Sequence, residues 1–182
     1  MKSQIIILQG GEDVKKRTNE ELMRSVCNLS ITKKILVIPW TSESDSKESE
    51  YVKVFQKYFT EIGFNEVIFL EKIEDEIDIN KKISSVDVIY LPGGDPEILY
   101  REIKVRSIDS KLKDFKGILI GNSAGAIVLS KGSVIEKKFF PGFGLVNFYV
   151  FVHFNLSEKL QFTTGPNICI PENTWLCISI SE

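Results

Sequence analysis

Uninterrupted apolar runs recur along the first two thirds of the chain, each followed by a more polar stretch. Runs of this kind, without strict alternation, are typical of strands buried on both faces. They occupy residues 4–11, 33–40, 65–70, 86–91 and 116–121. Because helical patterns separate them, the sequence predicts a parallel sheet covered by helices on both faces.

Apolar spacing also places two of the helices between these strands. The first is predicted to begin after Thr18 as its N-cap, because Thr18 and Glu21 have the spacing of a capping box. The second is predicted to end at Gly63, because glycine commonly follows the last turn of a helix. The core-facing positions recur at helical spacing: Leu22, Val26 and Leu29 in the first helix, and Val52, Phe55, Phe59 and Ile62 in the second.

The C-terminal third has a different pattern. Residues 143–155, 167–170 and 175–180 are short apolar, strand-like segments with no long helix between them. We therefore expect antiparallel additions at this end of the sheet. The chain lacks a linker and an internal repeat, so the prediction is one α/β domain over residues 1–182, with three α/β/α layers and a mostly parallel central sheet.

Composition narrows the function classes. The chain has 182 residues, 43% of them hydrophobic, and a net charge of −2 with both signs interspersed, which argues against disorder and against nucleic-acid binding. No apolar run approaches the roughly 20 residues that a membrane helix requires, so a cytoplasmic protein is expected. Cys27, Cys169 and Cys177 form no CxxC pair, which predicts buried free thiols and no zinc site.

The stretch GNSAG at 121–125 fits the G-x-S-x-G pattern between an apolar strand and a helix-compatible segment. A sharp strand-to-helix turn requires small residues on both sides of Ser123 and projects its hydroxyl outward. The N–H of Ala124 then lies at a helix N-terminus, where it can stabilise negative charge. A tight turn without chemistry is the alternative, since glycine and serine are common turn residues.

A second glycine-containing loop follows the preceding strand. Asp95 and Pro96 suit the N-cap and first position of a helix. Gly93 and Gly94 allow the backbone to approach a ligand and point N–H groups at it, as a second oxyanion donor must. A capped turn accounts for Asp95 and Pro96 but explains the glycine pair less well.

A serine nucleophile requires a base, and His153 is the only histidine of the chain. A lone histidine on an apolar strand can also be a core residue. Three acids follow it and could orient its ring: Glu158, Glu172 and Glu182. Glu172 is the best placed because it lies in a turn between two strands, and Glu136 remains a second candidate.

Four segments, LPGGDPEIL, IGNSAGAIVL, PGFGLVNFYVFVHFN and IPENTWL, resemble in that order the aspartyl dipeptidase (peptidase E) family of serine peptidases, relatives of cyanophycinase. The resemblance implies a flavodoxin-like fold of the class I glutamine amidotransferase type. It implies Ser123 as nucleophile, His153 as base and Glu172 as its partner, with oxyanion donors from Gly94 and Ala124. It also implies removal of an N-terminal aspartate from small peptides, without metal or cofactor.

Two departures leave the specificity open. Asp95 stands where the family commonly has asparagine, and the chain ends at ISISE, where relatives generally continue for a strand or two. Hydrolysis of an isoaspartyl or cyanophycin-type bond is therefore an alternative, as is a catalytically silent binding module on the same fold. The expected partner is a small peptide, with no nucleic acid and no membrane, and the sequence is compatible with a homodimer without specifying one.

Overall fold

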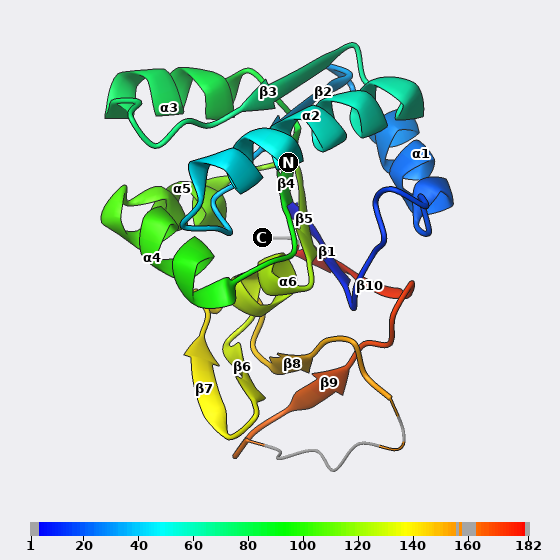
Figure 1. Ribbon diagram of the computed structural model, residues 1–182, viewed down its shortest axis with the longest axis vertical. Helices are drawn as coiled ribbons and strands as arrows, with labels where there is room; N and C mark the ends of the chain where they lie inside the picture. The colour runs from blue at the N-terminus through cyan, green and yellow to red at the C-terminus, as the bar shows by residue number, and fades with distance from the viewer. Residues whose placement is uncertain (1–3, 156, 158–162, 181–182) are drawn as a thin grey trace.

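The computed structural model describes residues 4–155, 157 and 163–180 (Figure 1). Its central sheet has six strands in the order β10-β1-β5-β4-β2-β3. All neighbouring strands are parallel except β10, which pairs antiparallel with β1. The strands are β1 (Gln4–Gln9), β2 (Lys34–Val37), β3 (Glu66–Phe69), β4 (Val88–Leu91), β5 (Ile118–Asn122) and β10 (Trp175–Ile180).

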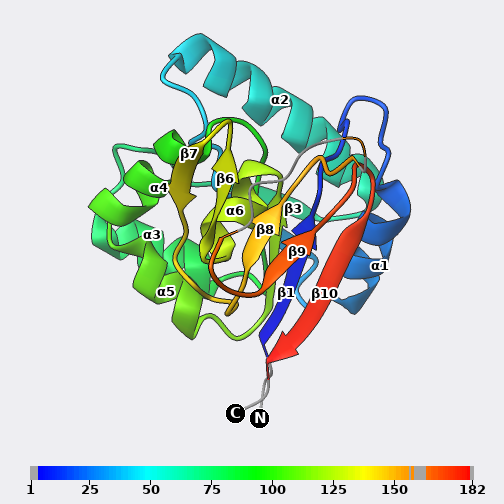
Figure 2. The same ribbon diagram turned by 90° about the horizontal axis from the view of Figure 1, so that it is seen from below.

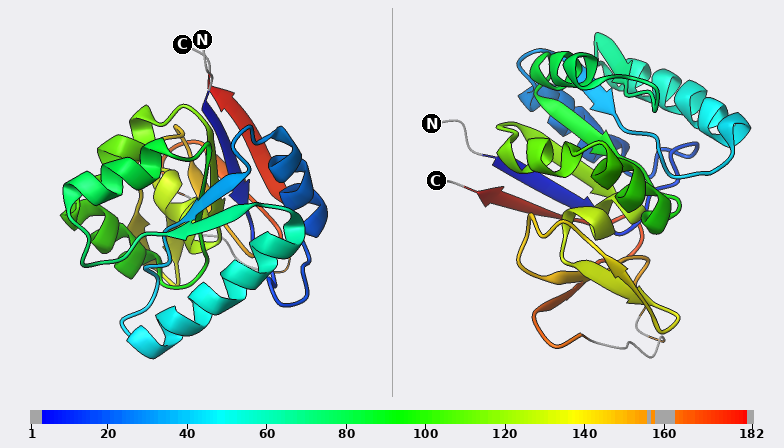
Figure 3. Two further views of the ribbon diagram at one scale, coloured as in Figure 1. Left: turned by 90° about the horizontal axis from the view of Figure 1, so that it is seen from above. Right: turned by 90° about the vertical axis from the view of Figure 1, so that its left-hand side faces the viewer.

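Helices cover both faces of this sheet, as Figures 1 and 3 show. Alternate side chains of strands β1 to β5 enter separate cores: Ile7, Tyr90 and Ile120 pack towards α1 (Glu20–Leu29) and α2 (Asp45–Ile62). Ile6 and Leu119 belong to the core on the other face. That face is covered by α3 (Glu76–Ser84), α4 (Pro96–Val105), α5 (Ile108–Asp114) and α6 (Ala124–Leu129). The predicted mostly parallel, three-layer α/β/α fold is confirmed.

The predicted start of the first helix is wrong in detail. Asn19 occupies the N-cap position, and its side chain makes no capping hydrogen bond. The Thr18 hydroxyl instead accepts a hydrogen bond from the N–H of Asp13, so it stabilises the preceding loop. Leu29 is the last residue of the helix and is 67% exposed, so its predicted place in the core is wrong.

The second helix follows its prediction. Phe55, Phe59 and Ile62 are buried, and Ser44 caps the N-terminus by accepting from the N–H of Lys47. The helix ends at Gly63, whose φ of +122° would strain any other residue. Val52 lies at the edge of the buried face and is half-buried.

Four strands of the C-terminal third form two small sheets outside the main one (Figures 2 and 3). The first is an antiparallel hairpin of β6 (Gly132–Ile135) and β7 (Lys138–Pro141), which the apolar pattern did not predict. The second pairs β8 (Tyr149–Phe151) with β9 (Asn167–Cys169) in parallel, so the expectation of antiparallel pairing is wrong for these strands. It is correct for β10.

The cysteines are free, but the prediction of three buried thiols is wrong. Cys27 is buried in the α1 core, whereas Cys169 is half-buried and Cys177 is exposed on β10. Alternate residues of β10 point to solvent, which places Cys177 outside. Within the described part of the chain, no helix is long and apolar enough to cross a membrane.

Candidate active site

Ser123 lies at the sharp turn between β5 and α6. Its φ of +49° and ψ of −104° are unusual for a residue with a side chain, and its N–H donates to the Gln9 carbonyl at 3.0 Å. A Cβ atom on Gly121 would lie 2.5 Å from the carbonyl group of Gly125, and one on Gly125 would lie 2.1 Å from the carbonyl oxygen of Leu91. The glycines two positions before and after the serine are therefore required by packing, as the motif predicts.

The Gly93–Gly94 loop lies directly against this turn. A Cβ on Gly93 would stand 3.4 Å from the Ser123 Cβ. Gly94 has a φ of +135°, and a Cβ there would come within 2.6 Å of the Thr41 side chain. In the described residues, the N–H groups of Gly94 and Ala124 have no hydrogen-bond acceptor, so both remain able to bind an incoming oxygen.

Asp95 acts as the N-cap of α4. Its carboxylate accepts from the N–H groups of Glu97 at 2.8 Å and Ile98 at 3.2 Å, and Pro96 is the first residue of the helix. Asparagine and aspartate are equally good N-caps. The departure from the family's usual asparagine is therefore compatible with the same local structure.

The serine, the histidine and one of the candidate glutamates are linked by hydrogen bonds. Ser123 Oγ lies 2.6 Å from His153 Nε2, and His153 Nδ1 lies 2.5 Å from Glu172 Oε1. If Nδ1 carries the ring proton and donates a hydrogen bond to Glu172, Nε2 is free to accept the proton of the serine hydroxyl. The side chains of His153 and Glu172 are 48% and 55% exposed, so the arrangement opens to solvent.

The other candidate acids are not part of this arrangement. Glu136 lies in the turn between β6 and β7, where its φ is +49°. Glu158 and Glu182 lie outside the described residues. The apolar neighbours of His153 suggested that it lies on a strand, but it does not. β8 ends at Phe151, and His153 follows two residues later with a φ of +54°.

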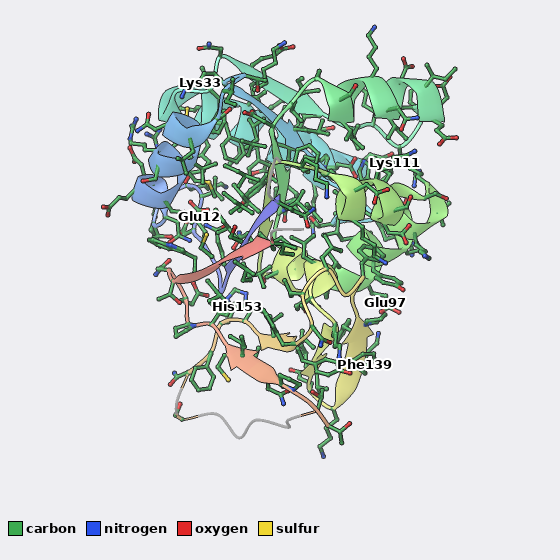
Figure 4. All side chains as sticks on the ribbon, turned by 180° about the vertical axis from the view of Figure 1, so that it is seen from behind. Glu12, Lys33, Glu97, Lys111, Phe139 and His153 are labelled. Carbon is green, nitrogen blue, oxygen red and sulfur yellow. The ribbon has the colours of Figure 1, made fainter. Side chains whose placement is uncertain are left out.

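A second glycine pair, at the end of β1, supports the histidine and the glutamate. The Gly10 carbonyl accepts from the N–H of His153 at 2.7 Å, and the Gly11 carbonyl accepts from the N–H of Asn173 at 3.0 Å. A Cβ on Gly11 would lie 2.6 Å from His153 Cε1 and 3.1 Å from Glu172 Cδ. Figure 4 shows His153 beside the lower end of β1.

The role of Gly10 and Gly11 was not predicted. The available signal was the similarity of this pair to Gly93–Gly94, since each follows a buried parallel strand. Loops at the carboxyl ends of parallel strands form the functional site in such sheets. Because β1 and β4 both neighbour β5, the two glycine pairs lie on either side of the serine.

This geometry suits attack of a serine hydroxyl on a carbonyl carbon. The imidazole can take the hydroxyl proton, a carboxylate orients the ring, and two backbone N–H groups can bind the developing oxyanion. Among the residues that the structure describes, no group of three or more His, Cys, Asp and Glu side chains could hold a metal ion.

Comparisons with known proteins identify the same class of enzyme. The family model of peptidase family S51 matches residues 5–179. The crystal structure of a peptidase from an acI-B1 actinobacterium superposes with a TM-score of 0.72 at 21% identity, covering 97% of this chain and 84% of that one. A peptidase E candidate from Listeria monocytogenes EGD-e gives a TM-score of 0.65 at 23% identity, covering 85% of this chain and 81% of that one.

No sequence among curated proteins matches the chain. Both structural neighbours are below 25% identity, so they bear on the fold, whereas the family model spans almost the whole chain. The chain belongs to peptidase family S51 and is a serine-type peptidase.

Proposed function

We propose that this peptidase hydrolyses small peptides through Ser123, His153 and Glu172, with a preference for an N-terminal aspartate. The observation that carries the proposal is the hydrogen-bond chain from Ser123 Oγ through the His153 ring to Glu172, with 2.6 and 2.5 Å separations. This series of contacts ends on a serine held at the apex of a strained turn.

The reaction proceeds in two stages. Ser123 Oγ attacks the scissile carbonyl carbon while His153 Nε2 removes the hydroxyl proton, and Glu172 stabilises the imidazolium that forms. The N–H groups of Gly94 and Ala124 bind the tetrahedral oxyanion, each contributing about 3 kcal/mol by comparison with measured cases. His153 returns the proton to the leaving amine, and water then hydrolyses the acyl-enzyme by the same route.

The aspartate preference is the finer part of the proposal. It rests on the resemblance of four segments to the peptidase E family and on the peptidase E description of the Listeria neighbour. The family match supports a serine peptidase in general. A substrate panel is therefore the test of specificity.

The panel compares aspartyl, β-aspartyl and neutral dipeptide analogues. We expect the highest kcat/KM for the aspartyl peptide and a loss of several orders of magnitude in Ser123→Ala, with folding retained. A higher kcat/KM for the β-aspartyl peptide would replace the aspartyl assignment with an isoaspartyl or cyanophycin-type one. Wild-type hydrolysis in Ser123→Ala would overturn the nucleophile itself.

The binding-module alternative is tested separately. A fluorophosphonate reacts with an activated serine without regard to the peptide sequence. Folded wild-type protein that resists the probe and cleaves none of the peptides would favour a silent binding module.

A further inference from the structure

Residues 9–12, which leave the end of β1, contact all three proposed catalytic residues. The Gln9 carbonyl accepts from the N–H of Ser123 at 3.0 Å, and the Gly10 carbonyl accepts from the N–H of His153 at 2.7 Å. Gly11 packs against the His153 ring and the Glu172 carboxyl carbon. The relative placement of serine, histidine and glutamate therefore depends on the path of this short segment.

The segment has few side chains that could fix that path, because its two middle residues are glycines. Gln9 is fully buried, yet in the described residues its amide makes no hydrogen bond that ties the segment to another element. Glu12 does have one: its Oε1 accepts from the hydroxyl of Tyr58 at 2.5 Å. Asn19 adds a longer bond, 3.4 Å, from its side-chain N–H to the Gly11 carbonyl.

Tyr58 is a rigid partner. It lies on the 18-residue helix α2, is 2% exposed, and packs against the ring of Phe59. Burial raises the pKa of Glu12, an effect only partly offset by the Tyr58 hydrogen bond, and burial followed by the Glu12 charge raises the pKa of Tyr58. Both shifts disfavour the charged form of each group, and the Tyr58 phenol donates to the Glu12 carboxyl group.

We propose that Glu12 is a positioning residue of this peptidase: bound to Tyr58, it anchors residues 9–12 to α2 and so holds Gly11 against the His153–Glu172 pair. The inference rests on the proposed function for its catalytic consequence, but the anchoring itself does not. Figure 4 shows Glu12 above His153 on the same side of the molecule. Glu12 touches none of the reacting atoms and acts through Gly10 and Gly11.

The test compares Tyr58→Phe, Glu12→Ala and Glu12→Gln. Tyr58→Phe and Glu12→Ala should each lower the fluorophosphonate labelling rate about tenfold, the value of one lost hydrogen bond. Glu12→Gln should recover most of the rate that Glu12→Ala loses, since an amide oxygen can still accept from Tyr58. In peptide hydrolysis the loss should fall on kcat rather than KM.

A spectroscopic readout separates positioning from general destabilisation. Because the chain has a single histidine, a far-downfield imidazole proton resonance reports the hydrogen bond between His153 and Glu172 alone. We expect this resonance to weaken or shift in Tyr58→Phe and Glu12→Ala and to return in Glu12→Gln. Tyr51→Phe is the matched control, because Tyr51 lies on the same helix and contacts Phe55 rather than Glu12.

Two results overturn the anchor. Folded Tyr58→Phe with the wild-type labelling rate and the wild-type resonance would show that residues 9–12 keep their path without the hydrogen bond from Tyr58. Glu12→Gln as impaired as Glu12→Ala would show that position 12 does not act by accepting from Tyr58. If Glu12→Ala fails to fold, Tyr58→Phe, which removes a single oxygen, carries the test. Wild-type protein that resists the probe and cleaves none of the peptides would overturn the proposed function, and the resonance comparison would still decide the anchor.

Discussion

Replacing Gly11 with alanine adds one methyl group at the point where residues 9–12 meet the His153 ring. The new Cβ would lie 2.6 Å from His153 Cε1 and 2.7 Å from Nδ1. Carbon atoms in contact prefer separations of about 3.5–4.0 Å, so the ring must retreat by about 1 Å. That movement would break or lengthen its bond to Ser123, to Glu172 or to both.

The cost should fall on the chemistry rather than on the fold. A 1 Å misplacement of a catalytic group lowers the rate by about 10²-fold, or about 2.7 kcal/mol of transition-state stabilisation. The ring that must move is 48% exposed and can swing outward. Alanine also reduces the entropy of the unfolded chain, which stabilises compatible sites by about 0.4–1 kcal/mol.

The assay measures the labelling rate constant with a fluorophosphonate, kcat/KM with the best peptide, and the free energy of unfolding in urea. Gly144→Ala is the control, because Gly144 is exposed, has a φ of +68°, and a Cβ added there would have no atom within 4 Å. It should lose about 1–2 kcal/mol of stability through backbone strain and keep its labelling rate. A Gly11→Ala protein labelled within about twofold of wild type would refute the reasoning from the 1 Å displacement.

Three further predictions concern titration and exposure. Burial raises the pKa of Asp87, but hydrogen bonds from residues 30–32 outweigh it and hold this pKa below its ordinary value near 3.8. The contribution of Asp87 to the free energy of unfolding should therefore be lost as the pH falls below that value. Asp87→Ala should cost about 1–3 kcal/mol in urea denaturation at neutral pH. Burial, opposed by Tyr58 and reinforced by Asp13, raises the pKa of Glu12 above its ordinary value near 4.5. As the pH rises, the Glu12 carboxyl group therefore loses its proton in the unfolded chain before it does so in the folded one, and the free energy of unfolding declines between the ordinary and the raised pKa. Glu12→Gln should remove this dependence of the free energy of unfolding on pH. Cys177 should react with a thiol reagent in the native protein and Cys27 only after unfolding, as peptide mapping would show; equal native reactivity would contradict their placement.

The sheet and the serine turn could be predicted because their signals are local. Continuous apolar runs mark β4 and β5, and the packing that requires Gly121 and Gly125 is visible in the spacing of the glycines themselves. The Gly93–Gly94 loop was predicted for the same reason.

One of the missed features lacks its usual local signal, and the others depend on contacts between distant segments. The β6–β7 hairpin turns at Glu136 and Lys137, two residues with positive φ that carry none of the usual glycine or asparagine signal. The parallel pairing of β8 with β9 joins strands that are separated by 15 residues, from 152 to 166, and no local pattern specifies such a pairing. Gly10 and Gly11 could be identified as strand-ending glycines, but their contact with His153 and Glu172 depends on where residues 153 and 172 return to β1.

Peptide mapping after fluorophosphonate treatment tests the central claim most directly, since it asks which atom of the folded protein is the activated nucleophile. We predict a single adduct on the peptide that contains Ser123, and no adduct in Ser123→Ala or in His153→Ala, which lacks the ring that lies 2.6 Å from Oγ. An adduct on another residue, or undiminished labelling of Ser123 in His153→Ala, would contradict the account.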